Sequence, residues 1–115
     1  MHELSIANNL LEAVQAEAQN HPGARFIRLG VRVGELTAVD PEALTFCFQV
    51  LVRGTELEAL ELEIEHVPRQ HRCQHCGQEF TVVDYDVTCP ACDTSETECI
   101  AGTELELAYL EMEEI

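Results

Sequence analysis

Four cysteines in this chain occur as two pairs with the same internal spacing. The pairs are Cys73 with Cys76 and Cys89 with Cys92, and twelve residues separate them. Two thiolates three positions apart on a tight turn can bind one metal ion, and a second such turn completes a tetrahedral shell of the kind that zinc prefers. Gly77, directly after the first pair, fits because such turns often need a residue at positive φ. The spacing predicts one Zn(II) ion held by all four thiolates.

A zinc ion with four thiolate ligands has no open position for water, so this site is expected to stabilise the fold. A thioredoxin-like redox site would need only one such pair, and disulfide frameworks are typical of secreted chains, whereas no secretory signal is evident here. We therefore expect a cytoplasmic protein. Of the other cysteines, Cys47 is expected in a helix core and Cys99 as a free thiol near the zinc module.

The N-terminus carries a second set of possible ligands, Met1, His2 and Glu3. A histidine at position two can chelate a square-planar ion through its imidazole, its own deprotonated amide and the terminal amine, which suits Ni(II) or Cu(II). Glu3 adds a carboxylate within reach. Many chains have a histidine there that is simply solvated, so the residues alone leave both interpretations open.

The charge balance narrows the choice of partners and functions. Twenty-two acidic residues against six Lys and Arg give a formal charge of −16 in 115 residues. This is the opposite of the basic surface that binds nucleic acid, and it favours cations and basic protein surfaces. No apolar stretch is long enough for membrane insertion. No nucleophilic triad, phosphate loop or open zinc site is visible, so we do not expect an enzyme.

Periodicity in the apolar residues predicts an α+β fold. The expected elements are a helix over residues 4–18, a strand over 27–33, a helix from 41 to Gly54 that Asp40 caps, a strand with an acidic outer face over 60–65, and a strand over 104–113. The last strand is apolar on both faces, so we expect it inside the sheet.

The chain changes character between the last two strands, where cysteines and short β-prone runs replace the helical periodicity. The sequence therefore predicts two helices on a three-stranded, mainly antiparallel sheet, with an inserted zinc-ribbon-like module. The expected domains are 1–69 plus 102–115 for the first and 70–101 for the zinc-binding module.

Several short motifs follow one another in a characteristic order. They are Met1-His2-Glu3-Leu4-Ser5-Ile6-Ala7, Val33-Gly34-Glu35-Leu36, Asp40-Pro41-Glu42-Ala43-Leu44, the two Cys-x-x-Cys pairs and Gly102-Thr103-Glu104-Leu105. This order, over essentially the whole chain, resembles the HypA/HybF family of hydrogenase nickel-incorporation proteins. The resemblance implies a nickel metallochaperone that acts with a HypB-type GTPase and delivers nickel to the large-subunit precursor of [NiFe]-hydrogenase.

The resemblance also implies residue roles. It makes His2 the principal nickel ligand, with Met1 and Glu3 beside it, and the four cysteines the zinc ligands. Asp40, a helix cap by its sequence, is linked to nickel or to partner docking in some members. A zinc-domain histidine completes the nickel site in part of the family, and His71 and His75 are the candidates here.

Three questions stay open at this stage. The first is whether the protein is a monomer or a homodimer. The second is whether urease is a client, as it is in some relatives. The alternative function is a zinc-ribbon adaptor whose acidic surface docks a basic partner without carrying nickel. Stoichiometric nickel binding that depends on His2 would distinguish the two functions.

Overall fold

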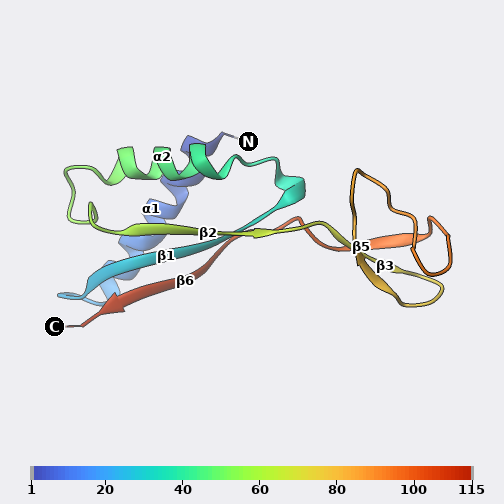
Figure 1. The fold of residues 1–115 in the computed structure, drawn as a ribbon. Coiled ribbons are helices and arrows are strands. Elements are labelled where there is room, and N and C mark those ends of the chain that lie inside the picture. Colours follow the sequence, from blue (N-terminus) through green and yellow to red (C-terminus); the bar gives the residue numbers. More distant parts are fainter. Residues whose placement is uncertain (1, 115) are drawn as a thin grey trace.

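The computed structural model describes residues 2–114, which form two three-stranded sheets in an elongated molecule of 56 × 26 × 16 Å (Figure 1). The elements are α1 (Glu3–Asn20), β1 (Arg25–Gly34), the 3-10 helix η1 (Glu35–Thr37), α2 (Pro41–Val52), β2 (Glu61–Val67), β3 (Gln70–Cys73), β4 (Glu79–Thr81), β5 (Thr97–Ala101) and β6 (Leu105–Glu113). The predicted α+β class, with two helices and a cysteine-bearing insertion, is confirmed.

The first sheet has the strand order β2-β1-β6. Strand β1 pairs antiparallel with β6 but parallel with β2, so the sheet is mixed, where the sequence analysis predicted a mainly antiparallel one. The parallel pair arises because α2 lies between β1 and β2 and returns the chain to the same end of the sheet. This βαβ crossover places α2 against the sheet and its N-terminus at the end where β1 finishes.

The expectation that the last strand lies inside the sheet is wrong, because β6 is an edge strand and β1 is central. A register shift places Leu107 opposite Val31, on the face that carries α1, and Tyr109 opposite Gly30, on the other face, and both side chains are partly exposed. The Tyr109 ring lies across Gly30 of β1, where a Cβ atom would stand only 2.0 Å from the ring. The extra apolar residues of β6 thus cover the central strand from its edge.

Both helices cover one face of this sheet (Figure 1). The core is made of Ile6, Ala7, Leu10 and Val14 from α1, Leu44, Phe48 and Val52 from α2, Phe26, Leu29, Val31 and Val33 from β1, and Val39 and Leu60. Cys47 is half-buried against this core. The Asp40 carboxylate accepts hydrogen bonds from the backbone N–H groups of Glu42, at 3.0 Å, and Ala43, at 3.4 Å, which confirms the predicted helix cap.

The second sheet, in the order β4-β3-β5, projects from one end of the first (Figure 1). It lies in the chain between β2 and β6, which both pair with β1. Backbone hydrogen bonds fasten the returning segment to the end of β1, from Gly34 N–H to the Glu104 carbonyl at 2.6 Å and from Leu36 N–H to the Gly102 carbonyl at 2.8 Å. The division into domains 1–69 plus 102–115 and 70–101 stays a proposal that this topology supports.

Candidate metal centres

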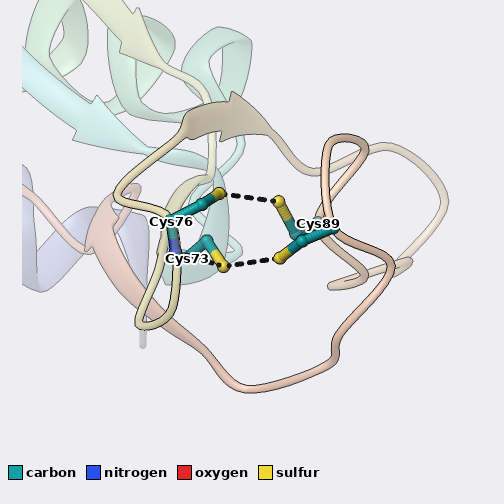
Figure 2. A group of neighbouring side chains, drawn as sticks. Cys73, Cys76 and Cys89 are labelled. Carbon is teal, nitrogen blue, oxygen red and sulfur yellow. Dashed lines mark hydrogen bonds between the residues drawn. The ribbon is translucent and has the colours of Figure 1, made fainter.

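The four predicted thiols converge at the far end of the second sheet (Figure 2). Their sulfur atoms all lie within 4.8 Å of one another, with 3.2 Å between Cys73 and Cys92 and 3.7 Å between Cys76 and Cys89. These separations are far longer than the roughly 2.05 Å of a disulfide bond. Zn–S bonds of about 2.3 Å in a tetrahedron place the sulfur atoms about 3.8 Å apart. The donor set and its spacing therefore fit Zn(II).

Two turns of the same form present these thiols. In the first, the N–H of Gly77 donates to the Cys73 carbonyl at 3.0 Å, and in the second, the N–H of Asp93 donates to the Cys89 carbonyl at 2.9 Å. Gly77 has φ +76°, which confirms the predicted left-handed position, and Asp93 has φ +64° at the matching place. The sequence analysis missed Asp93, although aspartate is one of the few residues other than glycine that adopt this conformation readily.

Backbone N–H groups favour a thiolate at the first cysteine of each turn. The Cys73 sulfur is buried and accepts from the N–H groups of Cys76 and His75, both at 3.4 Å, and the buried Cys89 sulfur accepts from Ala91 at 3.4 Å. The Cys76 N–H is the main reason that the pKa of Cys73 is lowered to about 6. The hydrogen bond to Cys73 raises the pKa of Cys92 to about 12. The backbone therefore favours the thiolate form of Cys73, which is the form that binds a cation.

The start of α1 lies beside the start of α2, and this contact positions the N-terminal residues. A carboxylate oxygen of Glu3 accepts a hydrogen bond from the backbone N–H of Asp40 at 3.2 Å. This bond is the main reason that the pKa of Glu3 is lowered, so the carboxylate is charged at neutral pH. Asp40 therefore links the two helix starts. Its side chain accepts a hydrogen bond from a backbone N–H group of α2, and its own backbone N–H donates one to Glu3. The sequence analysis missed this link.

His2 is exposed and precedes the first turn of α1. Its carbonyl accepts from the N–H groups of Ser5 and Ile6, at 3.1 and 3.2 Å, but its side chain caps nothing and has no hydrogen-bond partner among residues 2–114. The imidazole is therefore available to a ligand. Met1, the other predicted nickel ligand, lies outside the described residues.

The two histidines considered for the nickel site both belong to the cysteine module. His71 is buried, and its Nε2 accepts from the Nε–H of Arg69 at 3.1 Å, which leaves Nδ1 to donate to the Thr97 hydroxyl at 3.0 Å. Burial, and then the charge of Arg69, lower its pKa. His75 is exposed and hydrogen-bonds the Glu96 carboxylate. In this arrangement both His71 nitrogens are occupied, which argues against a nickel role for that residue.

No second cluster of side chains with metal-ligand spacing accompanies the cysteines within residues 2–114. The predicted nickel ligands Met1, His2 and Glu3 are consecutive along the chain. In the same range, no helix has the length and apolar character to cross a membrane.

Comparison with known proteins places the chain among nickel-handling proteins. Residues 1–112 match the family model described as hydrogenase/urease nickel incorporation, metallochaperone, hypA. The chain is 37% identical to the hydrogenase maturation factor HypA of Desulfosudis oleivorans, over 99% of this chain and 100% of that protein. It is 38% identical to the protein of the same name from Geobacter metallireducens, over 98% and 100% of the two chains.

Two solved structures share the fold. A solution structure of HypA protein superposes with a TM-score of 0.71 at 24% identity, covering 97% of this chain and 96% of that one. The solution structure of the Ni metallochaperone HypA from Helicobacter pylori gives a TM-score of 0.64 at 24% identity and covers both chains fully. Since the family match spans nearly the whole sequence and the same fold recurs, this chain belongs to the HypA family of hydrogenase nickel-incorporation metallochaperones.

Proposed function

We propose that this protein binds Ni(II) at its N-terminus and delivers it, in the cytoplasm, to the large-subunit precursor of [NiFe]-hydrogenase with the help of a HypB-type GTPase. The observation that carries the proposal is the exposed imidazole of His2, which has no hydrogen-bond partner among residues 2–114 and stands at the start of a chain that matches the nickel-incorporation family over residues 1–112. The protein acts as a carrier, and it has no catalytic step of its own.

The proposed chelate uses the His2 imidazole, the His2 amide nitrogen and the terminal amine of Met1, with Glu3 beside them. Nitrogen donors in a square plane suit Ni(II), and an exposed site lets the ion leave again. The hydrogen bond between Glu3 and Asp40 holds the chelating end of the chain against α2. Nickel is thus presented at a fixed place on the surface while its ligands stay accessible to an acceptor.

We assign the four cysteines to a structural Zn(II) ion. Two thiolates come from each of two matching turns, and no ligand position is left for water. This closed shell suits a resident ion, in contrast to the open site proposed for the nickel cargo. The adaptor alternative, in which His2 is incidental, is supported only by the acidic surface.

A cell that lacks this protein is expected to make [NiFe]-hydrogenase without nickel. The defect should be partly repaired by excess nickel salt, because a carrier raises the rate and selectivity of delivery without doing the chemistry. The measurement is the nickel content and activity of the purified hydrogenase with and without added nickel. A strain that expresses His2→Ala should behave like the deletion. Full nickel occupancy in either strain at low external nickel would contradict the proposal.

The zinc ion is expected to be released as the pH falls. Zinc replaces protons on the thiols, so each step of acidification favours the protonated thiols over the bound ion. Backbone N–H groups that lower the pKa of Cys73 to about 6 favour its thiolate over its thiol and oppose this competition at that residue. Release below neutral pH should precede unfolding of the helices, measured with a zinc-sensitive dye and by circular dichroism. A single transition that retains zinc throughout would count against a separate zinc module.

A further inference from the structure

Strand β6 has one unpaired edge. It pairs with β1 on one side, and no other strand of residues 2–114 lies on its second side (Figure 1). At nine residues it is about 30 Å long, and it contains neither proline nor a basic residue, two features that commonly block such an edge. Ala108 is an extra residue in the pairing with β1, but β6 has no further bulge after it. The N–H and C=O groups along this edge can therefore pair with another strand.

The face of β6 that is turned toward α1 borders a hollow, which we call the β6 hollow. Its volume is about 290 Å³. The apolar residues around it are Ile6, Leu10 and Ala13 of α1 and Leu105 and Leu107 of β6. Leu107 is 39% exposed, so an apolar surface is open to solvent directly beside the edge. Since pockets for small molecules begin at about 300 Å³, a hollow of this size suits an apolar side chain of a strand laid along β6.

On the opposite face of the sheet, the charges alternate from strand to strand. Arg32 of the central strand β1 lies between Glu65 of β2, at 2.9 Å, and Glu106 of β6, at 3.3 Å. Arg28 likewise lies 2.9 Å from Glu111 of β6, with glutamates of β2 on its other side. The order across the sheet is thus negative, positive, negative. Because opposite charges on neighbouring strands stabilise a sheet, a strand beyond β6 would continue this order with basic side chains.

These charges also select between the possible occupants and between the two edges of the sheet. A second copy of β6 would bring the glutamates of both copies together, and like charges on paired strands are destabilising. The edge at β2 is acidic too, but the hollow beside it is lined partly by the polar side chains of Glu42, Thr45 and Gln49. The edge of β6 therefore combines glutamates on one face with the more apolar hollow on the other.

We propose that the edge of β6 binds an extended segment of a partner protein in which apolar and basic residues alternate. The segment adds a fourth strand to the sheet β2-β1-β6. Because successive side chains of a strand point to opposite faces, its apolar side chains enter the β6 hollow while its Lys and Arg side chains lie beside Glu106 and Glu111. Backbone hydrogen bonds supply the affinity and the alternating side chains the specificity. This interaction goes beyond the proposed function and uses none of the proposed nickel ligands.

The probe is a synthetic peptide of about seven residues that alternates valine with lysine or arginine. It is titrated into the full chain without nickel, and binding is followed by fluorescence anisotropy and by the backbone amide shifts. We expect saturable binding, with the largest shift changes in β6 and around the β6 hollow. Two control peptides carry the same charge. One groups the valines and the basic residues in separate blocks, and the other is N-methylated at every amide, and both should bind at least about tenfold more weakly.

A matched pair of variants compares the two edges of the sheet. Glu106→Lys and Glu65→Lys each remove an exposed partner of Arg32, one on β6 and one on β2, so they change the net charge equally and cost little stability. The affinity for the alternating peptide should be about fivefold lower in Glu106→Lys than in Glu65→Lys. Ala13→Leu keeps the charge and the helix but fills the β6 hollow, so it should also weaken binding.

Three results would overturn the proposal: no saturable binding to the wild type, equal affinity for the alternating and the block peptides, or equal effects of Glu106→Lys and Glu65→Lys. Equal affinity of the two peptides would mean that only the net charge attracts them. A wild-type dimer with β6 in its interface would assign the edge to a second copy of the chain and overturn the proposal as well. Because no nickel is present in these titrations, their failure is distinguishable from failure of the nickel function.

Discussion

Replacement of Cys73 or Cys89 by serine is expected to abolish zinc binding and to unfold residues 70–101, while the helices and the first sheet keep their structure. Within 70–101 the buried residues are His71, Cys73, Val82 and Cys89, so little apolar surface opposes the entropy of the chain. The buried residues of the main core, in contrast, lie between Ile6 and Leu60, and residues of β2 and β6 pack against them. Structural zinc supplies on the order of 10 kcal/mol to small modules, which is enough to decide whether this one folds.

Cys99→Ser is the matched control for these variants. Cys99 is an exposed thiol of β5, in the same module but outside the four-sulfur cluster. The measurements are zinc content per chain and backbone amide exchange resolved along the sequence. We expect fast exchange over 70–101 in the two ligand variants and native protection in Cys99→Ser. Full zinc content and native protection in Cys73→Ser and Cys89→Ser would show that the ion is held elsewhere.

The cysteine cluster was predictable from the sequence because each half of it is local. The three-residue spacing within a pair determines which two thiols lie on the same turn. The residue after the pair has the positive φ that closes this turn. The helix cap at Asp40 was predictable for the same reason, since a carboxylate and a proline at adjacent positions act within a single helical turn. Such features need no knowledge of how distant segments meet.

Apart from the turn residue Asp93, the features that the sequence analysis missed depend on contacts between distant segments. The alternation of β6 shows two apolar faces but not that one of them covers Gly30 from a sheet edge. The parallel pairing of β1 with β2 follows from the crossover through α2, which the order of elements allows but does not require. The hydrogen bond from Asp40 to Glu3 joins residues 37 positions apart. This contact is what holds the N-terminal residues at a defined place.

Nickel affinity is expected to fall at least about a hundredfold in His2→Ala and equally in a form with a few residues added before Met1. The first change removes the imidazole, and the second removes the terminal amine from the chelate although every side chain is kept. Affinity of the wild type should rise from about pH 6 to about pH 8, because protons compete for the amine, amide and imidazole nitrogens. The measurement is calorimetric nickel titration of the untagged protein and both altered forms.

The histidine control for this titration is His21→Ala. His21 lies at the other end of α1, where its ring is near the carboxylates of Glu17 and Glu114, at 3.8 and 3.5 Å. If nickel binding only required a histidine beside acidic groups, His21 would serve as well as His2, and its loss would lower the affinity. If binding required a free chain terminus, His21→Ala would titrate like the wild type while the extended form would not. Equal nickel affinity in the wild type, His2→Ala and the extended form would place nickel elsewhere and remove the structural basis of the carrier function. The extended form is the decisive one, because it separates an N-terminal chelate from any site built of side chains alone.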